Sequence, residues 1–212
     1  TLNAQPPPRV PNARRTFWVA DGTTGGLRQV EARLRTQTAQ AAMWVEQELW
    51  HDVRTLEQAA EQFETEVYTP THAIFGSECS PGIDGDTRIQ ILHVAGLGDG
   101  VRGYASTRDL YPVSVHPLSN QAELIVVDAE TVEVGSLDYQ TLLAGELTRL
   151  ILWRQDRNEA AWVREGLVEL AASLVGADKE RIKESYVQQP DVPLTHWTNT
   201  DPQRGHAYLL MA

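Results

Sequence analysis

Cysteine is almost absent from this chain. Its 212 residues include a single cysteine, Cys79, which excludes an intrachain disulfide framework and a zinc site built from cysteines. Long apolar runs are missing as well, and no stretch approaches the roughly 20 residues that a membrane-spanning helix needs. The sequence therefore predicts no transmembrane segment.

Positive charge is scarce. The chain has 18 Lys and Arg against 29 Asp and Glu, a formal net charge of −11. Proteins that bind nucleic-acid backbones need an excess of Lys and Arg, so we expect no nucleic-acid partner. Phosphate-binding glycine loops and serine nucleophile signatures of the G-x-S-x-G type are also absent. The 42% of hydrophobic residues and 22% of charged residues are typical of a globular chain.

Proline is concentrated near the N-terminus, at Pro6, Pro7, Pro8 and Pro11. Such a cluster cannot join a helix or a central strand and favours an extended segment. We expect residues 1–15 to form an extended tether. Residues 16–212 are then the folded part, with one domain as the default at this length and two small ones as the alternative.

The first half of the chain is rich in short β-prone runs. Their composition and alternation predict strands at 17–19, 27–38, 41–45, 88–92 and 123–127. The last of these is apolar enough to be buried. Helical spacing of apolar residues predicts one helix from Asp52 to Val67, with Asp52 as its N-cap and Pro70 beyond its end.

Two longer helices are predicted in the second half, at about 138–153 and 159–175. The second has Asn158 as its expected N-cap and Gly176 where a C-terminal glycine belongs. Strands that precede packed helices in this way predict an α+β domain.

The first of these helices carries a carboxylate on its apolar face. Glu146 falls in the middle of the face that Leu142, Leu143, Leu150 and Trp153 form, where an unpaired charge is costly to bury. It is either a functional group or a snorkelling or salt-bridged side chain. Arg149 lies within i,i+3 reach of it. Gly145 costs the helix about 1 kcal/mol relative to alanine, which indicates a packing reason for its lack of a side chain.

The second helix has two acids along the border of its apolar side. Glu165 and Glu169 are spaced i,i+4, a like-charge pair that destabilises unless a positive group lies between them. Gly166 within the apolar side permits a close backbone approach. Three carboxylates therefore either converge on one shared site or lie on separate solvated faces.

These two helices resemble the signature of a known family. The stretches are Ala144-Gly145-Glu146-Leu147-Thr148-Arg149, then Asn158-Glu159, then Trp162-Val163-Arg164-Glu165-Gly166-Leu167-Val168-Glu169. They are similar to the HExxH…W-x-x-E-G-L-x-E region of gluzincin zinc metallopeptidases, closest to secreted bacterial hyicolysin-like peptidases. Weaker matches upstream are Phe17-Trp18-Val19, Pro81-Gly82-Ile83-Asp84-Gly85-Asp86, Gly103-Tyr104 and Ser119-Asn120.

The resemblance implies a zincin-like fold, with a twisted sheet packed on the two signature helices. It covers most of residues 16–210, and residues 205–210 are similar to a helix start that follows the family's active site. Because the chain ends early in that helix, the resemblance implies a short or truncated C-terminal subdomain.

The chain departs from the family at the zinc ligands. The two histidine positions fall on Gly145 and Arg149, the general base on Glu146 and the third ligand on Glu165. A catalytic zinc needs about three protein ligands. A permanent cation about 4 Å from a divalent ion adds a repulsion of roughly 8 kcal/mol at an effective dielectric near 20. We therefore expect no metal and no cofactor, which leaves Glu146 with no metal-bound water to activate.

Arg149 is the expected replacement for the metal charge. A guanidinium can bridge two carboxylates, so Glu146 and Glu165 can both stay ionised, with Glu169 as a further member of the former metal site. The resemblance thus predicts a catalytically inactive metallopeptidase homologue, a pseudopeptidase that binds a peptide or protein partner or acts as a scaffold. The alternatives are an active zinc metallopeptidase with relocated ligands and an N-terminal piece of a larger protein. The resemblance to secreted enzymes and the tether favour an extracellular or cell-surface-tethered location.

Other chemistry-bearing residues have weaker support. Of the six histidines, His51, His72, His93, His116, His196 and His206, no two share an i,i+4 spacing, so a replacement zinc site would have to join distant ones. Asp84-Gly85-Asp86 is too short for an EF-hand loop, and a turn is the favoured interpretation over a calcium contact. Cys79 has no positive neighbour in the sequence to activate it as a nucleophile.

Overall fold

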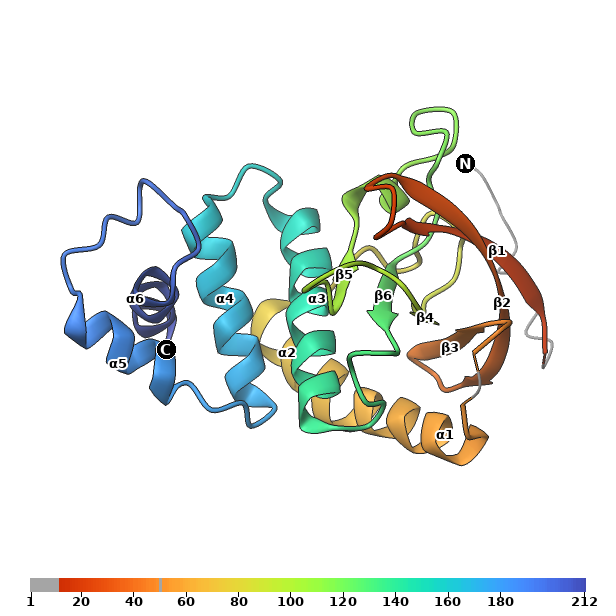
Figure 1. The fold of residues 1–212 in the computed structure, drawn as a ribbon, viewed down its shortest axis with the longest axis horizontal. Helices are drawn as coiled ribbons and strands as arrows, with labels where there is room; N and C mark the ends of the chain where they lie inside the picture. The colour runs from red at the N-terminus through yellow and green to blue at the C-terminus, as the bar shows by residue number, and fades with distance from the viewer. Residues whose placement is uncertain (1–11, 50) are drawn as a thin grey trace.

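A single curved sheet organises the molecule. The computed structural model describes residues 12–49 and 51–212. Within these residues, six strands pair in the order β1-β2-β3-β4-β6-β5 (Figure 1). Their bounds are β1 Arg14–Ala20, β2 Leu27–Gln37, β3 Ala41–Glu46, β4 Ile89–Val94, β5 Gly103–Ala105 and β6 Leu124–Asp128. β3, β4 and β6 are parallel, while β1, β2 and β5 are antiparallel to their neighbours.

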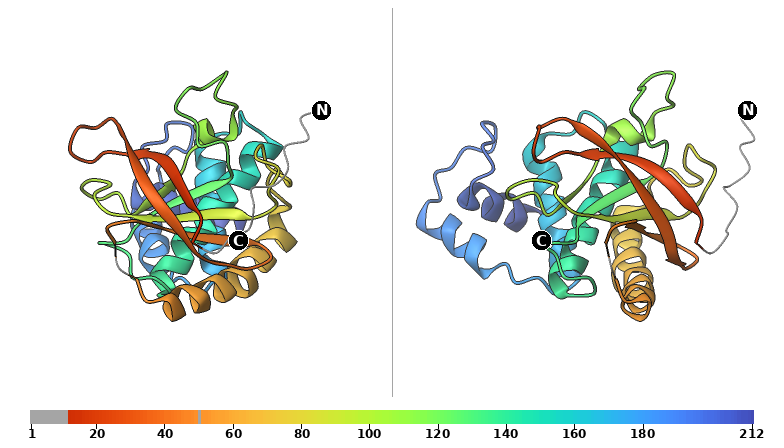
Figure 2. Two further views of the ribbon diagram at one scale, coloured as in Figure 1. Left: turned by 90° about the vertical axis from the view of Figure 1, so that its right-hand side faces the viewer. Right: turned by 45° about the vertical axis from the view of Figure 1, so that its right-hand side comes forward.

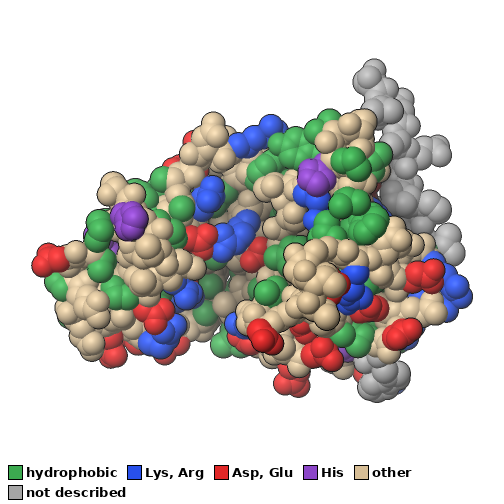
Figure 3. Space-filling view, turned by 45° about the horizontal axis from the view of Figure 1, so that its top comes forward, with side chains coloured by type: hydrophobic (Ala, Val, Ile, Leu, Met, Phe, Trp, Pro, Cys, Tyr) green, Lys and Arg blue, Asp and Glu red, His purple; other side chains and the backbone are tan. Residues whose placement is uncertain are grey.

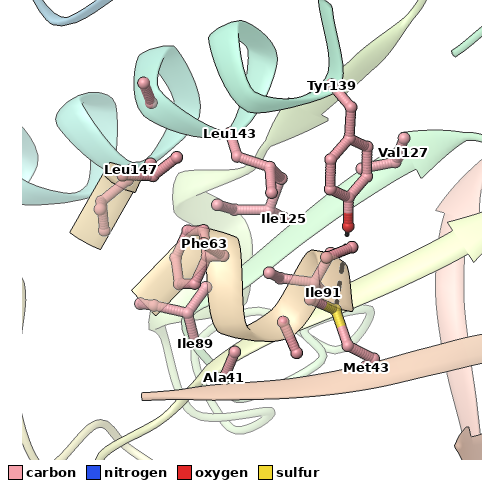
Figure 4. Packing of buried hydrophobic residues seen from close by; sticks show 14 of the residues in the cluster. Ala41, Met43, Phe63, Ile89, Ile91, Ile125, Val127, Tyr139, Leu143 and Leu147 are labelled. Atoms are coloured by element: carbon pink, nitrogen blue, oxygen red, sulfur yellow. Dashed lines mark hydrogen bonds between the residues drawn. The ribbon is translucent and has the colours of Figure 1, made fainter. Parts of the chain in front are cut away.

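The central strands are buried on both faces. Successive side chains point to opposite sides of a strand, and a hydrophobic cluster covers each side. In β6, Ile125 and Val127 face a cluster beneath the helices, and Leu124 and Val126 face a second cluster. Figure 4 shows the first cluster, in which the Tyr139 hydroxyl points to the Met43 sulfur. Burial on both sides explains why β6 reads as a continuous apolar run.

The second cluster lies inside the curl of the sheet. Figure 2 shows the β1–β2 hairpin curving across the strands that follow it. Phe17 of β1 contacts Trp44 of β3 edge-to-face, with 5.4 Å between ring centroids. β5 closes the opposite end of the sheet, where only β6 pairs with it among the described strands.

The helices lie mostly on one side of the sheet and then continue away from it (Figure 1). Their bounds are α1 Val53–Gln62, the π-helical turn η1 Phe63–Tyr68, α2 Thr69–Phe75, the 3-10 turn η2 Thr107–Leu110, α3 Leu137–Gln155, α4 Ala161–Leu174, α5 Glu180–Gln188 and α6 Asp201–Met211. α1 packs on β2 and β3, and α3 packs on β5 and β6. α4 packs chiefly on α3 and α6, with α5 against α6.

The predicted α+β class is confirmed, as are the five strand predictions to within a few residues. The detail of two helices packed on the sheet needs correction, since α4 lies mainly on the far side of α3. The helix predicted to end at Val67 instead runs on through η1 and Pro70 to Phe75. In an α-helix the proline ring clashes with an earlier carbonyl, and the wider π turn directly before Pro70 relieves this.

The helix caps are partly as predicted. Asp52 caps α1 by accepting from the Thr55 amide, and Gly176 ends α4 with φ +94°. Asn158 is not the N-cap of α4, because the helix begins after Ala160. The expected tether extends too far, since β1 already begins at Arg14, and residues 1–11 of it lie outside the described residues.

Two helical glycines stand where helices approach closely, as expected from the sequence. A Cβ on Gly145 would lie 3.1 Å from Cγ1 of Val168 on α4, and one on Gly166 would lie 2.8 Å from the carbonyl oxygen of Ala207 on α6. The side chain of Val168 can yield, but the backbone of Ala207 cannot.

Candidate functional site

The side chain of Glu146 extends from α3 to β5, the edge strand of the sheet. Its Oε2 accepts a hydrogen bond of 2.9 Å from the backbone amide of Ala105 in β5. Ala105 uses this amide for the carboxylate and not for pairing with β6. The bond explains why α3 carries an acid on its apolar face: the residue is largely buried, and a backbone donor of the sheet satisfies it.

Arg149 joins Glu146 to the next helix. Its two terminal nitrogens donate to both carboxylate oxygens of Glu165 on α4, at 2.5 and 2.8 Å. Its Nε lies 3.4 Å from Oε1 of Glu146. The guanidinium thus contacts both acids. Toward Glu165 it has the fork-shaped geometry that gives strong charge-assisted bonds.

The charges of this cluster shift one another's pKa values. Burial raises the pKa of Glu146, and the charge of Arg149 and the Ala105 amide only partly offset this. Burial alone would lower the pKa of Arg149, but Glu165 and Glu146 outweigh it, and the net shift is upward. Arg149 is therefore a fixed cation, while Glu146 takes up a proton more readily than an ordinary glutamate.

Glu169 does not join this cluster. Its Oε2 lies 2.8 Å from Nζ of Lys179, and its Oε1 accepts from Nε of Arg204 at 2.6 Å. Burial raises the pKa of Glu169, but these two cations outweigh that effect and lower it. The expectation of three carboxylates at one shared site is therefore wrong for Glu169, which ties α4 to the segments around α5 and α6.

The donor set at this position does not fit the zinc that the family resemblance implies. Gly145 has no side chain to offer, and the guanidinium of Arg149 fills the position between the remaining acids. Both oxygens of Glu165 bind Arg149, and one oxygen of Glu146 binds Ala105. Elsewhere in the described part of the chain, no three His, Cys, Asp or Glu side chains are grouped so that they could hold a metal ion.

The other candidate residues from the sequence make contacts that are typical of structural residues. Asp84 and Gly85 form a turn, as favoured from the sequence, and Asp86 pairs with Arg88. Burial raises the pKa of the Cys79 thiol, which disfavours the reactive thiolate. His93 is buried, with Nδ1 2.8 Å from the carbonyl oxygen of Trp44 and Nε2 2.9 Å from the Tyr139 hydroxyl.

A cavity of about 470 Å³ adjoins the Arg149 cluster. It is lined by Ala105, Thr107, Tyr111, Arg149, Trp153, Asp156, Arg157 and Arg164. Figure 3 shows Lys and Arg side chains gathered with acidic ones in the recess between the helical end and the sheet end. Sequence reasoning missed Arg157, Arg164 and β5. One signal was available: four of the chain's 18 Lys and Arg residues fall within residues 149–164.

Comparison with protein-family models and with curated proteins finds no match to this chain. The relationship to gluzincin peptidases therefore stays a prediction from the motif residues. In the described residues, no helix combines the length and the apolar character needed to cross a membrane.

Proposed function

We propose that this chain is a catalytically inactive, zincin-like metallopeptidase homologue that binds extended peptides. The observation that carries the proposal is the seat of Arg149. Its guanidinium binds both oxygens of Glu165 and approaches Glu146, at the positions where the family resemblance expects a metal with its third ligand and general base. A fixed cation supplies the charge that holds the two acids, but no water of lowered pKa.

The free side of β5 is the proposed binding edge. β5 pairs with β6 on one side only among the described strands, and an exposed strand edge is a template for an added peptide strand. Glu146 accepts from the Ala105 amide at this edge. An arriving peptide either leaves that bond in place and pairs with neighbouring backbone groups, or displaces the carboxylate and takes the amide.

Hydrogen exchange of the intact chain tests this proposal. The probe is reduced and carboxymethylated α-lactalbumin, an unfolded protein, added with and without zinc. We expect saturable binding without cleavage, and slower amide exchange in residues 103–105. β1, at the opposite edge of the sheet, is the internal control, and its exchange should stay unchanged.

Three results would overturn the proposal. Cleavage of the probe that a chelator abolishes would establish a peptidase with relocated ligands. Protection of β1 in place of β5 would assign the wrong edge. Absence of saturable binding would remove the binding function altogether.

A further inference from the structure

The cavity beside Arg149 has a charge opposite to that of the whole chain. Three arginines and one acid, Asp156, line it, whereas the chain as a whole has a net charge of −11. Arg149 is neutralised by Glu165 and Glu146. The cationic character that a ligand would meet therefore comes from Arg157 and Arg164.

Neither of these two arginines is used by an ion pair within the described residues. Arg164 donates one bond of 3.3 Å to the backbone carbonyl of Glu159. The guanidinium of Arg157 lies over the ring of Trp153, 4.2 Å from its centroid. Arg164 is partly buried and Arg157 is exposed. An arginine without a carboxylate partner can bind an anionic ligand, because its in-plane N–H donors are the groups that recognise anions.

The contact with Trp153 positions Arg157 for this task. The guanidinium lies over the indole ring, and this cation–π contact favours that position while leaving the N–H donors of Arg157 without a carboxylate partner among the described residues. Trp153 is itself held edge-to-face by Tyr111, with 5.7 Å between ring centroids. The arginine is thus ordered before a ligand arrives, which lowers the entropy cost of binding.

The cavity is continuous with the proposed peptide edge, since Ala105 belongs to both. We infer that Arg157 and Arg164 select a carboxylate on a peptide seated along β5, so that the module prefers acidic segments. This inference rests on the proposed function. The carboxylate comes either from an Asp or Glu side chain or from the peptide's C-terminus, which present the same chemistry to a guanidinium.

Matched peptides test the inference by fluorescence polarisation with the full chain at low salt. The probe is a fluorescein-labelled, C-terminally amidated peptide of alternating threonine and valine with one central glutamate. Its partners carry glutamine at that place, one amidated and one with a free C-terminus. We expect the glutamate peptide to bind at least about tenfold more tightly than the amidated glutamine peptide, as a charged hydrogen-bonded pair provides, and the preference to weaken in high salt.

Variants of the chain assign the preference to the cavity. Arg157→Gln and Arg164→Gln should each bring the two amidated peptides close to equal affinity, chiefly by weakening the binding of the glutamate peptide. The matched control is Arg154→Gln, because Arg154 lies in the same segment but donates to Ser77 and to the Glu78 carbonyl, outside the cavity. That variant should keep the full preference.

The outcomes separate the two proposals. Tighter binding of the free-C-terminus glutamine peptide supports the inference and assigns the carboxylate to the terminus. Equal binding of all three peptides, or a preference that survives in both Arg157→Gln and Arg164→Gln, overturns the inference but leaves peptide binding intact. If no peptide binds, and the unfolded protein does not bind either, the proposed function and the inference are both wrong.

Discussion

Removing the charge of Arg149 should destabilise the fold through the acids it leaves behind. Truncating one partner of a buried ion pair costs about 3–5 kcal/mol, and exposed pairs cost about 0–1 kcal/mol. The side chain of Arg149 is 34% exposed, and those of Glu165 and Glu146 are 20% and 12% exposed. We therefore expect Arg149→Met to lower the free energy of unfolding by about 2–3 kcal/mol, between those limits.

A double-mutant cycle isolates the ion pair from other effects of the substitution. Arg149→Met, Glu165→Gln and the double variant should give a coupling energy of about 1.5–2.5 kcal/mol in urea denaturation. Arg181→Met is the control, because Arg181 forms an ion pair with Asp201 on the surface. The Arg181 side chain is 70% exposed. That variant should cost less than about 1 kcal/mol.

The cost of Arg149→Met should also depend on pH. The pKa of Glu146 is raised by burial, and Arg149 is the main group that opposes this rise. Without the cation that pKa rises further, so the native variant binds its proton at higher pH than the native parent does. The variant therefore recovers stability relative to the parent as the pH falls. A coupling energy below about 0.5 kcal/mol, or a cost independent of pH, would refute the role assigned to Arg149.

Three further predictions concern the core. Burial raises the pKa of Glu123 to about 7, so stability is lost as pH rises through that value, and Glu123→Gln should be more stable than the parent by about 2–3 kcal/mol near pH 8 in urea denaturation. Burial lowers the pKa of His93 to about 4, so His93 removes stability as the pH falls below about 6.5. The stability of His93→Phe relative to the parent should therefore increase as the pH falls from 7 to 5 in urea denaturation. Gly166→Ala should cost about 1–3 kcal/mol in thermal unfolding, whereas Gly145→Ala should be nearly neutral, since a helix gains about 1 kcal/mol from alanine; equal costs would contradict the packing described for the two glycines.

The strands were predictable because local composition reflects burial. Residues 124–127 form an unbroken apolar run that suits a strand covered on both faces, and Val30, Ala32 and Leu34 alternate as a half-covered strand must. β5 was not predicted, because a strand of 3 residues has no period to detect.

Part of the candidate site could be predicted from helical spacing and from the family resemblance. Arg149 follows Glu146 by about one helical turn, and the resemblance to the peptidase signature predicted Glu165 beside them. The partners of Glu169 could not be predicted in this way, because Lys179 and Arg204 follow it by 10 and 35 residues and reach it only through the packing of the last helices. The cavity arginines were missed because the cavity forms only when the end of α3 and the start of α4 pack beside residues 105–111, which are distant in the sequence.

Zinc titration of two proteins tests the central claim most directly. One is the native chain and the other is the Gly145→His/Arg149→His variant, which places on α3, near Glu165, the histidine pair that the resemblance to gluzincin peptidases expects. Isothermal calorimetry with elemental analysis of the dialysed proteins should show no zinc bound to the native chain and about one zinc ion per variant chain, as a three-ligand site requires. Stoichiometric zinc on the native chain would contradict the account, because a metal would then share the position assigned to the guanidinium of Arg149.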